Sequence, residues 1–175
     1  MIVLVLGANN SGKSLYAEEL AARLSTGALY YIATMIPYGK DGQARVVKHR
    51  TQRATKGFVT IESPFCVAKT PLLPGAVVLL EDASNLLSNG LFGSTPKKDE
   101  NSIFTDIINI CAKCQDAVIV SIDGLSATLE YDEETNYYIK ALNRLNRRLF
   151  NFADRAVIMR GGKPNLLKGE GYELD

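Results

Sequence analysis

The sequence contains no tryptophan, one histidine and three cysteines among its 175 residues. The three cysteines, Cys66, Cys111 and Cys114, are too few for a disulfide framework. The Cys111–Cys114 pair has the spacing of half a zinc site, but no second Cys/His pair completes it, so we interpret the pair as one side of a helix. These shortages predict a reduced, cytoplasmic protein.

The sequence also lacks an excess of charge of one sign and any long apolar run. Twenty lysines and arginines face 19 aspartates and glutamates, which gives a formal net charge of +1. No net field therefore attracts nucleic acid or a membrane surface. No apolar run approaches the roughly 20 residues that span a bilayer, and Met1–Leu6 lacks the basic start of a signal peptide. We expect neither a nucleic acid nor a membrane as partner.

Short apolar runs alternate with amphipathic stretches along the chain. This alternation predicts an α/β fold with a mostly parallel sheet flanked by helices, and the length predicts one domain over residues 1–175. The expected strands are Ile2–Leu6, Leu29–Ala33, Phe58–Ile61, Ala76–Leu80, Ala117–Ile122 and Ala156–Met159, with an antiparallel edge at Asn165–Lys168. The expected helices are Ser14–Leu24, Gln43–Arg53, Ser84–Phe92, Ser102–Cys114 and Glu133–Phe152.

The segment Gly7–Ser14 lies between the first expected strand and the first expected helix. It follows the P-loop pattern of Gly, four residues, Gly, Lys and Ser or Thr. Glycines let the backbone N–H groups point inward at phosphate oxygens, and the helix dipole adds to the attraction. Lys13 is expected to reach the β- and γ-phosphates, and the Ser14 hydroxyl to bind Mg²⁺. The segment predicts a P-loop NTPase-like fold that takes GTP or ATP with Mg²⁺.

An acidic pair follows the apolar run Ala76–Leu80. Glu81 and Asp82 stand where a carboxylate at the end of a neighbouring strand holds or orients the metal ion. The spacing does not decide between the two carboxylates, and two solvated acids at a strand end are the alternative. From these residues alone the function is that of a nucleoside triphosphatase or a kinase-like transferase.

His49 is the only histidine of the sequence and is surrounded by Lys48, Arg50 and Arg53. These cations favour the neutral imidazole, which is the form that attacks phosphorus. An incidental surface histidine on a basic helix is the alternative.

Several motifs together resemble the bifunctional adenosylcobinamide kinase / adenosylcobinamide-phosphate guanylyltransferase family of cobalamin biosynthesis. They run in family order over most of the chain: Gly7–Ser14, Tyr31–Thr34, Arg45–Arg50 with Arg53, Gly57–Glu62, Val78–Glu81 and Asn143–Leu149 leading to Ala153–Asp154.

The resemblance implies phosphorylation of the aminopropanol hydroxyl of adenosylcobinamide, then transfer of GMP from GTP onto that phosphate through a covalent intermediate on His49. It also implies a P-loop α/β sheet with one antiparallel strand and a homotrimer. From the loop and the acidic pair themselves, we take Ser14 and Glu81 as the candidate metal site. The implied nucleotide contacts are Gly7, Ala8, Asn9, Asn10, Ser11, Gly12, Lys13, Ser14, Ala33, Thr34, Met35, Arg50, Thr51, Gln52, Arg53, Glu62 and Glu81.

Two segments depart from the family pattern. Asn10 stands where many members have arginine, and Ile122–Asp132 replaces the usual Asn-Glu-Val-Gly stretch and the Gly-x-Val-Pro that follows it. We place acceptor recognition in Ile122–Asp132. Two further hypotheses stay open: a P-loop kinase for another small molecule, and a nucleotide-binding protein without catalysis.

Overall fold

A computed structural model of the chain describes residues 1–36, 56–93 and 95–170. The expected helix Gln43–Arg53 lies outside these residues, and so do His49 and Arg50–Arg53. Within the described residues one sheet has the strand order β3-β2-β4-β5-β1-β6-β7. Its strands are β1 (Ile2–Gly7), β2 (Leu29–Ala33), β3 (Val59–Glu62), β4 (Val77–Glu81), β5 (Asp116–Ile122), β6 (Arg155–Arg160) and β7 (Lys163–Lys168).

All neighbouring strands pair in parallel except β6 and β7, which form an antiparallel hairpin at the sheet edge. The central strands are apolar throughout because helices cover both of their faces. The expected fold, a mostly parallel sheet with an antiparallel edge strand, is confirmed.

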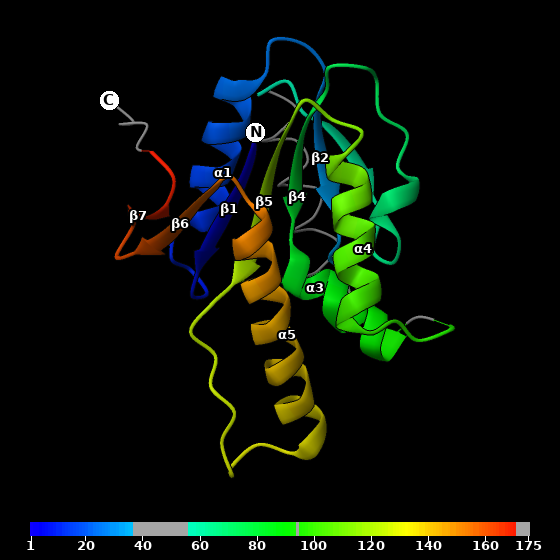
Figure 1. Cartoon of the computed structure of the whole chain (residues 1–175), viewed down its shortest axis with the longest axis vertical. Coiled ribbons are helices and arrows are strands. Elements are labelled where there is room, and N and C mark those ends of the chain that lie inside the picture. The colour runs from blue at the N-terminus through cyan, green and yellow to red at the C-terminus, as the bar shows by residue number, and fades with distance from the viewer. Residues whose placement is uncertain (37–55, 94, 171–175) are drawn as a thin grey trace.

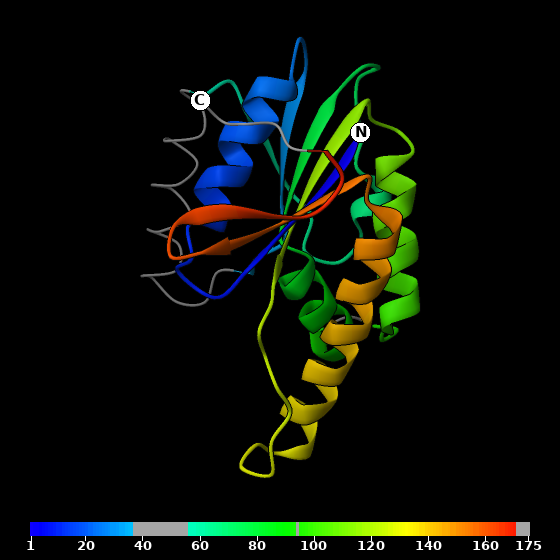
Figure 2. The same ribbon diagram turned by 60° about the vertical axis from the view of Figure 1, so that its left-hand side comes forward.

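The helices lie in two layers, one on each side of the sheet (Figures 1 and 2). Helix α1 (Lys13–Leu24) covers one face, where it packs on Val3, Val5 and Leu79. The other face carries α3 (Ala83–Ser88), α4 (Glu100–Cys111) and α5 (Glu133–Phe152). Successive strand residues alternate between the two faces, so Leu4 points away from α1 and belongs to the core beneath α3, α4 and α5. None of the helices in the described part of the chain is both long and apolar enough to cross a membrane.

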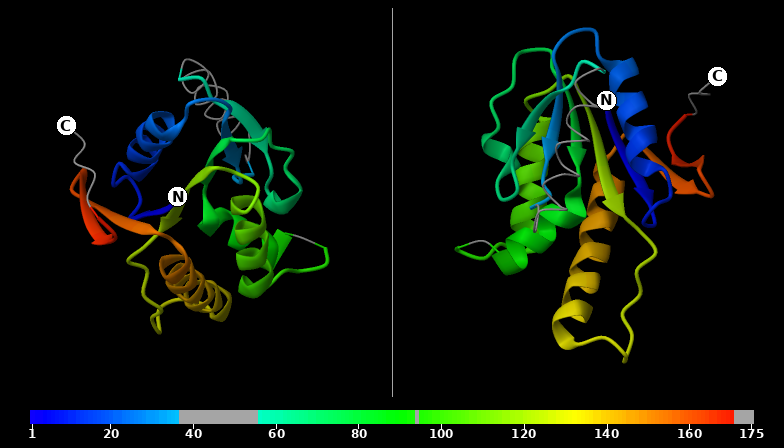
Figure 3. Two further views of the ribbon diagram at one scale, coloured as in Figure 1. Left: turned by 45° about the horizontal axis from the view of Figure 1, so that its top comes forward. Right: turned by 180° about the vertical axis from the view of Figure 1, so that it is seen from behind.

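Helix α5 extends beyond the carboxyl ends of the strands, and the segment after β5 runs beside it (Figures 1 and 3). Side chains of α5 hold this segment. Asn146 donates from Nδ2 to the Ile122 carbonyl at 2.8 Å, and Asn136 donates to the Thr128 carbonyl at 2.8 Å. The stretch that departs from the family pattern is therefore tied to α5.

Two helices differ from the expected ranges. The expected helix Ser84–Phe92 divides into α3 and a π-helical turn, η2 (Asn89–Gly93). At Gly90 a Cβ atom would lie 2.9 Å from Cδ1 of Ile103, so glycine permits the close approach of η2 to α4. The helix expected over Ser102–Cys114 begins at Glu100, since Asp99 caps its N-terminus, and ends at Cys111. A short 3₁₀ turn, η1 (Val67–Lys69), packs against α4.

Candidate functional site

The loop between β1 and α1 has a backbone that depends on its glycines. Gly12 has a φ of 87° and Asn10 a φ of 59°, both in the left-handed region. A Cβ atom at Gly7 would lie 2.5 Å from Oγ of Ser11, so a side chain there would displace the loop. No side chain caps the N-terminus of α1. Its first N–H groups are therefore left for an anion, as the sequence pattern predicts.

Lys13 is folded back over this loop. Its side chain is buried, and its Nζ donates to the Ala8 carbonyl oxygen at 3.2 Å. Because the ammonium group is already held inside the loop, a phosphate would meet a cation in place and exchange one carbonyl contact for charge-assisted hydrogen bonds.

Ser14 connects the loop to the end of β4. Its hydroxyl donates a hydrogen bond to Oε1 of Glu81. The other carboxylate oxygen of Glu81, Oε2, is buried without a hydrogen-bond partner in the described part of the chain. An orphaned carboxylate oxygen beside a serine hydroxyl is an oxygen donor set of the kind Mg²⁺ prefers. The residues present therefore fit a magnesium ion.

The two adjacent carboxylates have different surroundings. Burial raises the pKa of Glu81 from 4.5 to about 7, opposed by the hydrogen bond from Ser14 and the charge of Lys13. Burial also raises the pKa of Asp82. However, Asp82 caps α3, with Oδ1 accepting from the Asn85 N–H at 2.6 Å and from the Ser84 hydroxyl. Glu81 is the carboxylate that faces the loop, which the sequence spacing did not decide.

The ends of β2 and β3 lie in register with Glu81. Ala33 pairs with Glu81 on one side and with Glu62 on the other. Glu62 and Met35 are exposed at this edge, whereas Thr34 is fully buried. The structure thus brings Ala33, Thr34 and Glu62 to the same end of the sheet as the loop. His49 and Arg50–Arg53 lie outside the described residues.

One residue that the sequence analysis did not select also belongs to this edge. Asn89, in η2, donates from Nδ2 to the carbonyl oxygens of Thr34 at 2.7 Å and Pro64 at 2.9 Å. It bridges the segments that follow β2 and β3. The only signal in the sequence is a polar residue next to glycine inside an otherwise helical pattern.

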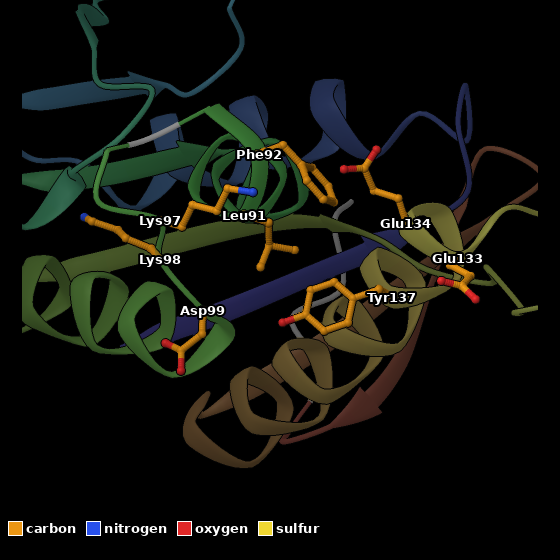
Figure 4. Close-up of a pocket in the computed structure, with 8 residues that line it drawn as sticks. All are labelled: Leu91, Phe92, Lys97, Lys98, Asp99, Glu133, Glu134 and Tyr137. Carbon is orange, nitrogen blue, oxygen red and sulfur yellow. The ribbon is translucent and has the colours of Figure 1, made fainter.

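Open cavities lie at this end of the described part of the chain. One, of about 590 Å³, is bounded by the loop residues Ala8–Ser11, by Asp123 and by the β6–β7 turn at Gly161 and Gly162. Another, of about 700 Å³, lies between η2 and the first turns of α5 (Figure 4). Leu91, Phe92, Lys97, Lys98, Asp99, Glu133, Glu134 and Tyr137 line it. The first cavity adjoins the phosphate-binding loop directly.

Comparison with solved structures places the fold. FlaH, a flagellar accessory protein of Methanocaldococcus jannaschii, superposes with a TM-score of 0.54 at 13% identity, over 96% of this chain and 78% of that chain. An ATPase of the type III secretion system of pathogenic bacteria superposes with a TM-score of 0.50 at 9% identity, over 90% of this chain and 50% of that one. At these identities the likeness concerns the fold alone.

Comparison of sequences is more specific. The chain is 26% identical over 173 residues to the bifunctional adenosylcobalamin biosynthesis protein CobP of Pseudomonas aeruginosa, covering 95% of this chain and 97% of that protein. The family described as cobinamide kinase / cobinamide phosphate guanyltransferase matches residues 3–167. The match includes the loop, the ends of β2, β3 and β4, and helix α5. This chain therefore belongs to the cobinamide kinase / cobinamide phosphate guanyltransferase family.

Proposed function

We propose that this protein is an enzyme of cobalamin biosynthesis that phosphorylates adenosylcobinamide and then transfers GMP from GTP onto the new phosphate. The observation that carries the proposal is the pairing of Ser14 with Glu81 beside the buried ammonium group of Lys13. This arrangement lies at the carboxyl edge of the sheet in a chain of this family. It supports the handling of a nucleoside triphosphate rather than a purely structural role.

In the kinase step the loop binds and orients the triphosphate. The backbone N–H groups of Asn9–Ser14 cradle the phosphates, and Lys13 balances charge on the β- and γ-phosphates. The aminopropanol oxygen of the acceptor attacks the γ-phosphorus and its proton is released to solvent, the bond to the β-phosphate oxygen breaks, and the nucleoside diphosphate leaves. Holding the two reactants in line and stabilising the phosphate charge account for most of the rate gain in such reactions.

Mg²⁺ is the cofactor that this site would hold. Ser14 and Glu81 would bind it, and when bound it supplies positive charge next to the phosphate oxygens. Glu81 has to be ionised for this, so its raised pKa makes metal binding depend on pH near neutrality.

The guanylyltransferase step is assigned to His49. Its neutral imidazole nitrogen attacks the α-phosphorus of GTP, the bond to pyrophosphate breaks, and a histidine–GMP phosphoramidate forms. A phosphate oxygen of the acceptor then attacks the same phosphorus, the P–N bond breaks, and the imidazole is regenerated. Ala33, Thr34, Met35, Arg50–Arg53 and Glu62 are the further nucleotide-side residues that the family resemblance implies.

The test is turnover with the family's acceptor. Incubation with adenosylcobinamide, GTP and Mg²⁺, followed by mass spectrometry of the corrinoid, is expected to give first a phosphorylated product and then its GMP adduct. Lys13→Ala is expected to lose both products, whereas Lys140→Ala, at an exposed lysine of α5, retains both. Phosphorylation of other small molecules but not of adenosylcobinamide would favour the general kinase. Binding of GTP without any transfer would favour the non-catalytic protein.

A further inference from the structure

Thr34, the first residue after β2, holds the peptide group that joins Glu81 to Asp82. Its backbone N–H donates to the Glu81 carbonyl oxygen at 3.0 Å. Its Oγ1 accepts from the Asp82 N–H at 2.7 Å and donates to the Asp82 carbonyl oxygen at 2.8 Å. Both polar atoms of the peptide group between Glu81 and Asp82 are thus bonded to one residue.

The Thr34 hydroxyl is committed to these contacts. A hydroxyl has one hydrogen to donate, and here that hydrogen goes to the Asp82 carbonyl. The residue is fully buried, so no part of its side chain is open to solvent. These contacts point to an effect of the Thr34 hydroxyl exerted through Glu81. The nucleotide contact that the family resemblance implies for Thr34 stays a prediction.

Asn89 fixes Thr34 from the other side. The Nδ2 of Asn89 donates to the Thr34 carbonyl oxygen at 2.7 Å and to the Pro64 carbonyl oxygen at 2.9 Å. The Ser63 N–H in turn donates to the Ala33 carbonyl at 2.8 Å. The ends of β2 and β3 and the turn η2 are therefore joined to the backbone that carries Glu81.

We propose that Thr34 is a positioning residue that fixes the Glu81 carboxylate against Ser14, and that Asn89 supports it. The inference rests on the proposed role of Glu81 at the nucleotide-bound metal. Because metal ligands must be held within a few tenths of an ångström, loosening the Glu81 backbone weakens cation binding without removing any group that touches the nucleotide.

Four substitutions separate positioning from bulk packing. Thr34→Val keeps the shape but removes the hydroxyl, and Thr34→Ser keeps the hydroxyl. Thr70→Val is the matched control, because Thr70 is a buried threonine just after η1 whose hydroxyl has no hydrogen-bond partner in the described part of the chain. Asn89→Ala leaves Thr34 intact and serves as a second variant should Thr34→Val fold poorly.

The measurement is GTP binding by calorimetry, first at a series of Mg²⁺ concentrations and then with the metal removed by a chelator. Each variant is measured at a temperature below the midpoint of its thermal unfolding. Thr34→Val removes both hydrogen bonds of the hydroxyl, and we expect it to raise the half-saturating Mg²⁺ concentration about tenfold, within the range that the loss of two hydrogen bonds allows. Asn89→Ala is expected to shift it in the same direction by less. Thr34→Ser and Thr70→Val should match the wild type, and metal-free GTP affinity should stay unchanged throughout.

Three results would overturn the inference. Unchanged Mg²⁺ dependence in both Thr34→Val and Asn89→Ala would remove the positioning role. An equal loss in Thr34→Ser and Thr34→Val would assign the effect to packing. A matching loss of metal-free GTP affinity would make Thr34 a direct nucleotide contact. If the wild type itself shows no Mg²⁺-dependent GTP binding, the proposed function fails, and the role of Thr34 fails with it.

Discussion

The hydroxyl of Ser14, at the start of α1, donates a hydrogen bond to Oε1 of Glu81, at the end of β4 and 67 positions further along the chain. In the sheet, β5 lies between β4, which ends at Glu81, and β1, which leads into the P-loop. The contact therefore joins the phosphate-binding loop to a carboxylate across the carboxyl edge of the sheet.

Lys13→Ala is expected to weaken GTP binding by tenfold or more while leaving guanosine binding nearly unchanged. The reason is that Lys13 is a buried cation held inside the loop, and a charge-assisted hydrogen bond contributes about 1.5–3 kcal/mol. Calorimetric titration with GTP and guanosine tests this, with Lys140→Ala as control. Equal GTP affinity in a folded Lys13→Ala protein would remove the loop from the nucleotide site.

Glu81→Gln is expected to change how stability depends on pH. Burial raises the pKa of Glu81 to about 7 in the folded state, whereas the unfolded chain keeps the ordinary value near 4.5. The folded wild type binds more protons between these values, so its stability falls as pH rises through this window. Relative to the wild type, Glu81→Gln should therefore gain about 3 kcal/mol between about pH 4 and pH 8.

Urea unfolding of both proteins at several pH values measures this gain. Glu100→Gln is a suitable control because the pKa of Glu100 is lowered, by its hydrogen bond with Arg144. The ionised Glu100 stabilises the folded wild type, and this contribution is lost as the pH falls. The difference in stability between the wild type and Glu100→Gln should therefore change with pH in the direction opposite to that for Glu81→Gln. A pH-independent difference for Glu81→Gln would contradict the raised pKa.

Mg²⁺ binding to the GTP complex should strengthen as pH rises through about 7. Glu81 has to lose its proton to bind the cation, so binding below this pH releases a proton. The apparent Mg²⁺ affinity, measured from about pH 6 to about pH 8, should rise in the wild type. It should be weaker in Glu81→Gln, with only the smaller slope that protonation of the terminal phosphate of GTP gives. A slope equal to that of the wild type would place the titrating group elsewhere.

Much of the fold was predictable because the core strands are continuous apolar runs. The expected range Leu29–Ala33 agrees with β2, and the expected helix Glu133–Phe152 agrees with α5, which buries Ile139, Leu142, Leu145 and Leu149. The division of the helix after β4 was not predictable, because η2 lies close to another helix, where a Cβ atom at Gly90 would be 2.9 Å from Cδ1 of Ile103. Local periodicity contains no information on such contacts.

The candidate site was predictable where spacing along the chain determines the geometry. Gly7–Ser14 is one local motif, so its loop and the position of Lys13 follow from the sequence. The choice between Glu81 and Asp82 could not be predicted, since it depends on which carboxylate turns toward Ser14 and which caps α3. Asn89 was missed because both of its partners are backbone carbonyls of distant segments.

Leu142→Ala is expected to cost about 2–5 kcal/mol of unfolding free energy. Leu142 is completely buried between α5 and the sheet, so the truncation removes apolar contacts and leaves a cavity. Leu129→Ala is the matched control, since Leu129 is fully exposed on the segment beside α5, and it should change stability by less than about 0.5 kcal/mol. Similar losses in both variants would contradict the packing of α5 on the sheet.

The most direct test of the proposed enzyme is the intact mass of the protein after incubation with GTP and Mg²⁺, with pyrophosphate removed enzymatically. We predict the added mass of one GMP per chain, released by acid and stable in alkali as a phosphoramidate is, and no addition in His49→Ala. An adduct of the same yield in His49→Ala would assign the nucleophile to another residue. A wild-type protein that binds GTP and never gains the adduct would contradict guanylyl transfer through His49.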